Sequence, residues 1–356
     1  LQKQDILFDK HTEDNYTDYY FERNIPEVLS TQGPHAAVAD VNKDGLEDVF
    51  IGGAAGQSGQ LYMQSGSGSF IKSEQPAFTQ FAAFEDIAVL FLDADGDNDA
   101  DLFVGSGGNN MPQGSRELQH RLYLNDGKGN FTLQLKSFPS NNDNTSVAVA
   151  NDFDGDGDQD LFVGSRCVSR EYGVTPTSHL YSNDGKGHFT EMPADKISGI
   201  NQAGMVTGAV WANITGDNAK ELIVVGAWMA PKVFEYKSNA FHEVKSNLDE
   251  MNGWWQTIAA TDIDKDGYDD LIMGNIGDNF YLQASAQAPL KLWLTDFDEN
   301  NTVDAVLSRS INKKDVPVFM KREITDQLPA LKKQNLKHED FAQKSIQDLF
   351  GATLLK

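Results

Sequence analysis

Aspartates recur at fixed spacing in six segments of this chain, and the spacing suits a hard cation. The third segment shows the pattern clearly, with Asp152, Asp154, Asp156 and Asp160 at positions 1, 3, 5 and 9 of a glycine-containing loop. Alternate side chains of such a loop point toward one centre, and Ca²⁺ accepts six to eight oxygen ligands. We therefore predict that these segments are cation-binding loops.

The same four positions carry carboxylate or amide side chains in five of the six segments. The residues expected to bind cations are Asp40, Asn42, Asp44, Asp48, Asp93, Asp95, Asp97, Asp101, Asp152, Asp154, Asp156, Asp160, Asp262, Asp264, Asp266, Asp270, Asp296, Asp298, Asn300 and Asp304. The fourth segment has Asn213 and Thr215 in place of acids, so we expect it to be weak or empty. The sequence thus predicts about four to six bound ions.

Calcium is the cation that these loops favour. An EF-hand needs a glutamate at position 12, whereas here apolar strand residues such as Val104 and Val163 occupy it. Mg²⁺ prefers a water-rich octahedron, and Zn²⁺ lacks its usual histidine and cysteine ligands in these loops. One aspartate cluster alone would also suit a solvated turn. Five copies before the same type of strand favour metal sites.

A second motif recurs between the loops and predicts a β-hairpin. It reads Leu-Tyr-x-Asn-Asp-Gly-Lys-Gly from Leu122 and from Leu180, with a looser copy from Leu61. Glycine supplies the positive φ that such a tight turn needs. Each unit of about 50 to 60 residues then holds four short strands, as propeller blades do. We predict an all-β fold, a β-propeller of six or seven four-stranded blades (seven favoured), followed by a short helical C-terminal segment.

The composition argues against several classes of protein. The 356 residues include 53 acidic and 29 basic side chains, and the net charge of −24 opposes binding to nucleic acid or to an anionic membrane. No apolar run is long enough for a transmembrane helix. The single cysteine, Cys167, rules out an internal disulfide bond. We expect it to be a small, half-buried side chain, with a reactive thiol as the alternative.

Together the loops and their following strands resemble the FG-GAP/VCBS repeats, which are calcium-loop propellers related to the integrin α-subunit head. A narrower resemblance, to bacterial surface proteins that pair such repeats with an ASPIC/UnbV domain, is carried by Gly33-Pro34, Gly204-Met205-Val206-Thr207, Gly253-Trp254-Trp255 and Gln327-Leu328-Pro329. The resemblance implies bound calcium, export from the cell, and further repeats or domains in a longer chain. Because no signal peptide is visible at the start, we expect the leader to lie outside this sequence.

Two long connections are the places where we expect a ligand. Residues 106–120 and 166–179 join the second and third strands of their units, and such insertions gather on one face of a repeat array. The basic and aromatic residues in or beside them are Arg116, His120, Arg166, Arg170, Tyr172 and His179. Trp254 and Trp255 could add a sugar-stacking platform. Alternatively, the basic residues pair with nearby acids and the tryptophans pack between blades.

The repeat divides the chain into three parts. Residues 1–32 lack the repeat and could close the ring as an outer strand, residues 33–308 form the propeller, and residues 309–356 carry a net positive charge. Within the last part, residues 323–333 and 339–350 have helical patterns. We expect a linker or insertion that packs on the propeller, with docking of a partner as the alternative.

The sequence favours binding over catalysis. It contains no His-Glu-x-x-His or Gly-x-Ser-x-Gly motif and no phosphate-binding loop, and its clustered acids are needed as metal ligands. We therefore expect a calcium-stabilised, non-catalytic module, secreted or on the cell surface, that recognises a protein or a glycan. The alternatives are a calcium-dependent polysaccharide lyase on a propeller scaffold and a purely structural adhesin segment.

Overall fold

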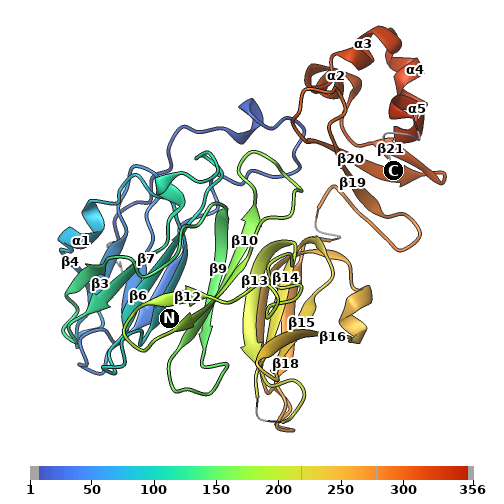
Figure 1. The fold of residues 1–356 in the computed structure, drawn as a ribbon. Helices are drawn as coiled ribbons and strands as arrows, with labels where there is room; N and C mark the ends of the chain where they lie inside the picture. Colours follow the sequence, from blue (N-terminus) through green and yellow to red (C-terminus); the bar gives the residue numbers. More distant parts are fainter. Residues whose placement is uncertain (1–7, 218, 278–279, 352–356) are drawn as a thin grey trace.

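The computed structural model describes residues 8–217, 219–277 and 280–351, and its sheets confirm the predicted all-β architecture. Antiparallel sheets stand side by side in an arc, from the blue and green sheets to the yellow ones in Figure 1. Each complete sheet is a meander, in which strands that follow one another in the sequence pair side by side. Among the described residues, no helix has both the length and the hydropathy needed to cross a membrane.

Among the described residues, four blades are complete and a fifth contributes two strands. The first contains β1 (Ala36–Ala39), β2 (Asp48–Ile51), β3 (Gln60–Gln64) and β4 (Phe70–Ser73). The second contains β5 (Asp86–Leu92), β6 (Asp101–Ser106), β7 (Arg121–Asn125) and β8 (Phe131–Gln134). The third contains β9 (Asn144–Asn151), β10 (Asp160–Cys167), β11 (His179–Asn183) and β12 (Phe189–Glu191). The fourth and fifth contain β13 (Met205–Ala212), β14 (Glu221–Met229), β15 (Lys232–Lys237), β16 (Ala240–Val244), β17 (Gly253–Thr261) and β18 (Asp270–Asn275).

Neighbouring blades pack through the strand that follows each aspartate loop. Every residue of β6 and of β10 is buried, because successive side chains point to opposite faces of a strand and both faces meet another blade. Phe103 packs against Leu161 and Val163 of the third blade. Phe162 packs in the same way against Leu222 of the fourth. The central apolar residue of one blade therefore meets the flanking residues of the next.

The two end blades each keep one face open. Ile272 occupies the central position in β18 and is 53% exposed, and Val38 in β1 is also 53% exposed. In the part of the chain that the structure describes, β1 pairs with neither β17 nor β18. The described blades therefore form an arc, and the predicted count of six or seven is not confirmed.

Residues 290–350 form a separate unit beyond the blades, drawn in orange and red in Figure 1. Its sheet contains β19 (Leu290–Thr295), β20 (Asp304–Ile311) and β21 (Lys314–Pro317), and its helices are α2 (Lys321–Gln327), α3 (Ala330–Gln334), α4 (His338–Ala342) and α5 (Ile346–Phe350). The helices pack on the sheet through Val306, Ile324, Leu331 and other apolar residues. The predicted helical C-terminal segment is confirmed. The sixth aspartate loop lies in this unit, between β19 and β20.

The remaining helical turns lie in connections and in the N-terminal segment, which we define as residues 8–35. They are η1 (Asp18–Tyr20), α1 (Pro76–Thr79), η2 (Arg116–Leu118) and η3 (Asn247–Glu250). Residues 8–35 contain no strand, so the outer strand expected within residues 1–32 is absent from the described part of that range. Residues 1–7 lie outside the described residues. Ile25 and Leu29 join an apolar core with Tyr172 and Trp254. The segment is therefore anchored across the blades.

Candidate functional site

The aspartate loops join the first and second strands of each blade, so they gather at one end of the sheets. In the third loop, Asp152 organises the turn: the N–H of Gly155 donates to its Oδ1 (2.7 Å) and the N–H of Gly157 donates to its Oδ2 (3.0 Å). Both glycines have left-handed backbone, with φ of 79° and 100°, which glycine adopts without steric cost. One carboxylate can therefore fold the loop around a central site.

Four loops bring three carboxylates together. Oxygens of the acids at positions 1, 3 and 9 lie within 4.8 Å of one another in the groups Asp93, Asp95 and Asp101; Asp152, Asp154 and Asp160; Asp262, Asp264 and Asp270; and Asp296, Asp298 and Asp304. Three converging oxygens begin the coordination shell of a hard cation. The predicted ligand at position 5 is arranged differently: Asp156 accepts a hydrogen bond from the N–H of Asp158 (3.0 Å) and lies outside the group.

The ninth residue of a loop also ties the loop to its own sheet. Asp101 is fully buried; its Oδ2 accepts from the N–H of Ala94 (2.9 Å) and its Oδ1 from the N–H of Asn125 (2.8 Å). Burial raises the pKa of Asp101 and of the equivalent Asp160 to about 7, against the lowering effect of such hydrogen bonds, and neighbouring acids raise it further. A bound cation would favour the charged form that burial disfavours. The second, third, fifth and sixth loops thus fit a hard cation.

Among the residues that the structure describes, the first and fourth loops do not bring three acids together. In the first, position 3 is Asn42, whose Oδ1 accepts from the N–H of Asp44 (3.0 Å) and whose Nδ2 donates to the carboxylate of Asp44 (3.0 Å). In the fourth, the hydroxyl of Thr215 donates to Glu221 (2.7 Å). There a neutral hydroxyl donates to a carboxylate whose equivalent in the four three-acid loops faces two further acids.

Two asparagines outside the predicted set hold the loops in place. The Nδ2 of Asn125 donates to the carbonyl of Val41 in the first loop (2.8 Å) and to that of Ala100 in the second (3.2 Å). Asn183 makes the equivalent bonds to the second and third loops (3.0 and 3.2 Å). Each amide therefore braces the loops of two consecutive blades. The sequence did contain a signal for these two asparagines, because each is the last residue of the recurring Leu-Tyr-x-Asn motif.

The connections with the predicted ligand residues lie at the opposite end of the sheets, where the N-terminal segment covers several of them. Its Glu27 accepts hydrogen bonds from the Arg166 guanidinium (2.8 Å), the Tyr172 hydroxyl (3.1 Å) and the Trp254 indole N–H (3.3 Å). The side chains of Arg166 and Glu27 are only 8% and 16% exposed. Arg166 thus pairs with an acid of the chain itself.

A second acid of the N-terminal segment, Glu22, is buried in the same network. Its Oε2 accepts from the Nδ2 of Asn109 (2.7 Å) and its Oε1 from the N–H of Tyr172 (2.6 Å). Burial raises the pKa of Glu22 although these bonds lower it. Arg170 lies over the ring of Phe21, 4.1 Å from its centroid. Acids and an aromatic ring of the segment therefore engage residues expected to meet a ligand.

The other predicted ligand residues lie away from this network. His120 is buried between the second and third blades, its ring centroid 6.4 Å from that of His179, and burial lowers its pKa to about 3. Arg116 is exposed, whereas Trp255 is buried. Cys167 is also buried, which raises the pKa of its thiol. These side chains do not share one surface.

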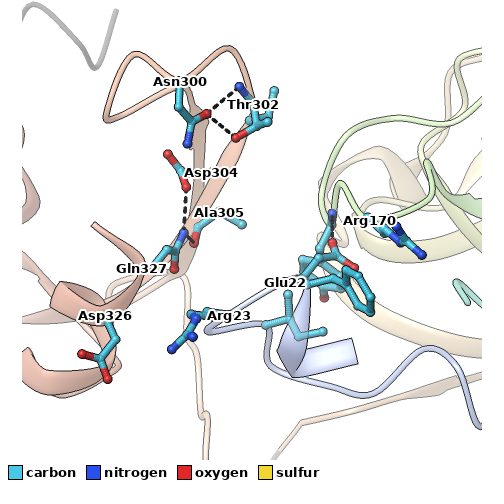
Figure 2. A pocket seen from close by; sticks show the side chains of 13 residues that line it. Glu22, Arg23, Arg170, Asn300, Thr302, Asp304, Ala305, Asp326 and Gln327 are labelled. Carbon is cyan, nitrogen blue, oxygen red and sulfur yellow. Dashed lines mark hydrogen bonds between the residues drawn. The ribbon is translucent and has the colours of Figure 1, made fainter. Parts of the chain in front are cut away.

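One cleft is bordered by both groups of predicted site residues (Figure 2). It has a volume of about 380 Å³ and lies between the N-terminal segment, the connection that holds Arg170 and Tyr172, and the C-terminal unit. Asp304 of the sixth loop lines the far wall. Gln327 links the walls, because its Nε2 donates to Asp304 Oδ1 (3.1 Å) while its Oε1 accepts from Asn24 Nδ2 (2.6 Å).

Comparison with known proteins identifies the repeats. The family model described as FG-GAP-like repeat matches residues 40–104, 113–163, 152–224 and 213–273, which include the first five aspartate loops. No curated protein sequence matches the chain. Among solved structures, the chain is similar to a rhamnogalacturonan lyase of Bacillus licheniformis, with 12% identity, 79% of this chain and 67% of that chain covered, and a TM-score of 0.36. The family model alone covers more than half of the chain.

Proposed function

The chain belongs to the FG-GAP-like repeat family, and we propose that it is a calcium-stabilised binding module that recognises a protein or a glycan without catalysing a reaction. The convergence of three carboxylates in each of four loops carries the proposal. It gives the clustered acids a structural role as ligands of a hard cation. The opposite end of the sheets is then the surface that a partner can use.

We place this module outside the cell or on its surface. Calcium loops of extracellular modules bind at roughly 10⁻⁴ to 10⁻³ M, which is too weak for a cytosolic site. Loops with three converging acids and an exposed position 5 suit this class better than a cage of many fixed ligands. We also propose that the protein is related to the VCBS proteins and to the bacterial proteins associated with ASPIC/UnbV domains. Further domains in a longer chain are part of the same proposal.

The topology supports separate roles for the two ends of each blade, with cation binding at one end and partner binding at the other. In an antiparallel meander, the connection between strands one and two and the connection between strands two and three lie at opposite ends. The metal loops form the first set, and residues 107–120 and 168–178 belong to the second. A partner bound at the second end of the blades would therefore leave the cation ligands of the five blade loops untouched.

A binding screen with and without calcium tests the proposal. The full chain is immobilised and presented to a glycan array and to a panel of extracellular proteins, in millimolar CaCl₂ and in EDTA. We expect a selective interaction in calcium that is lost in EDTA. If no glycan or protein binds in calcium, a structural adhesin segment is favoured instead. If uronate-containing polysaccharide yields unsaturated, ultraviolet-absorbing products, the lyase alternative replaces the non-catalytic one.

A further inference from the structure

The cleft between the N-terminal segment and the C-terminal unit offers two charged side chains that the protein itself leaves free. Arg23 comes from the N-terminal segment and Asp326 from helix α2, and both line the cleft (Figure 2). Both are exposed, and neither makes a hydrogen bond or ion pair among the described residues. They contrast with Arg166 and Glu27, which pair with each other nearby. The cleft thus holds a donor and an acceptor available to a ligand.

Other polar groups of the cleft are fixed in position. The carboxamide of Gln327 is held at both ends, by Asp304 and by Asn24. In the sixth loop, Asn300 accepts hydrogen bonds from the N–H (2.8 Å) and the hydroxyl of Thr302. Its oxygen is therefore occupied, while its Nδ2 can still donate. Groups fixed before binding lose less entropy when a ligand arrives.

The balance of charge favours a neutral ligand over an ion. The cleft is lined by the guanidinium groups of Arg23 and Arg170 and by the carboxyl groups of Glu22 and Asp326, while its third acid, Asp304, belongs to the carboxylate group of the sixth loop. An anion would meet the two carboxyl groups and a cation would meet the two guanidinium groups. A hydroxyl group both donates and accepts, so a polyol can satisfy carboxylates and guanidinium groups together.

The shape and the apolar parts of the cleft agree with this chemistry. Its volume of about 380 Å³ lies at the low end of the range for small-molecule clefts. The aromatic ring of Phe21, which is exposed, is part of the lining and offers apolar surface beside the polar groups. A short stretch of sugar units fits these dimensions better than the broad surface of a folded protein, which needs about 800 Å² on each partner.

We propose that this cleft binds a neutral saccharide, either the end or a short internal part of a glycan, with Arg23 and Asp326 as its free hydrogen-bonding groups. The inference rests on the proposed binding function and selects the glycan from the two partner classes that it allows. Hydrogen bonds to charged side chains are stronger than those between neutral groups. Each of the two should therefore contribute at least roughly a tenfold gain in affinity.

The test uses the full chain at saturating calcium and an array of neutral and acidic oligosaccharides, followed by titration calorimetry with the best neutral binder. We expect Arg23→Ala and Asp326→Ala each to weaken binding at least tenfold, with unchanged melting temperatures because neither side chain has a partner to lose. Arg322→Ala and Asp340→Ala are matched controls. Both residues are exposed and do not line the cleft, so their affinities should equal that of the unaltered chain.

The outcomes separate this inference from the wider proposal. If a neutral glycan binds and neither cleft substitution weakens it, the sugar site lies elsewhere and the inference is wrong, while the binding function stands. If only acidic glycans or only proteins bind, the assignment of a neutral saccharide is likewise overturned. If neither array nor protein panel gives any interaction in calcium, the proposed binding function fails as well.

Discussion

Removal of calcium should destabilise the protein by an amount that depends on the four loops in which three acids converge. At a calcium concentration ten times the dissociation constant, each occupied loop adds about 1.4 kcal/mol to the free energy of unfolding. Four such loops add roughly 5–6 kcal/mol, comparable with the whole stability of a typical domain. Since about 1 kcal/mol corresponds to roughly 2–4 °C in a domain of this size, we expect a melting temperature about 10–20 °C lower in EDTA.

A substitution within one loop makes the prediction sharper, because its sign should depend on calcium. Burial and the neighbouring Asp156 and Asp152 raise the pKa of Asp154, which means that its charge is unfavourable in the metal-free loop. Asp154→Asn should lower the melting temperature in calcium by about 3–6 °C, as one site weakens. In EDTA the same change removes repulsion, so the melting temperature should rise or stay constant. Asp217→Asn, in the fourth loop outside the three-acid groups, is the control.

Differential scanning calorimetry in CaCl₂, MgCl₂ and EDTA measures both effects. An identical melt in calcium and in EDTA would refute the stabilising role of the loops. Equal effects of the Asp154 and Asp217 substitutions in calcium would refute the distinction between a three-acid loop and the fourth loop.

Three further predictions concern groups outside the carboxylate clusters. Asn125→Ala should cost about 2 kcal/mol, since it removes the donor to the buried carbonyl of Val41 and to the half-buried carbonyl of Ala100. The exposed Asn130→Ala should cost less than half of that, and urea denaturation measures both. Burial raises the pKa of Glu85 to about 8, so the folded state keeps a proton that the unfolded state releases above pH 4.5. The stability should therefore fall as the pH rises from 4.5 to 8. Glu85→Gln should flatten this decline, as measured by the urea midpoint. Glu27→Gln should cost about 3–5 kcal/mol by leaving the buried Arg166 without its counter-charge, and the cost should shrink when Arg166 is replaced as well; equal costs in both backgrounds would contradict the pairing.

The sequence predicted the loops well because their geometry is local. Asp152 folds its own loop through residues three and five positions ahead, and the glycines that allow it are visible in the motif. The position-5 acids were harder, since Asp156 can either bind a cation or cap the N–H of Asp158, and the spacing is the same in both cases. The brace at Asn183 was missed because its partner carbonyl in the second loop lies 89 residues away.

The end of the sheets that carries the long connections could be located from the sequence, but the residues that meet there could not. The long connections do lie opposite the aspartate loops, as strand order requires. That Arg166 and Tyr172 would meet Glu27, across 139 and 145 residues, depends on where the N-terminal segment crosses the blades. No periodicity marks an irregular segment of this kind. The cleft has the same origin, because it forms where three segments distant in sequence come together.

The candidate cation sites and the apolar core involve the same strand, which explains why one motif contains both. In every loop the ninth residue is the first residue of the strand that follows: Asp101 begins β6, Asp160 begins β10 and Asp304 begins β20. A cation therefore fixes the first residue of the strand whose next residues bury against a neighbouring blade. In the sixth loop, the strand so fixed belongs to the wall of the cleft. Calcium at Asp304 would thus hold the far wall of the saccharide site in place through Gln327, even if no sugar atom touched the ion.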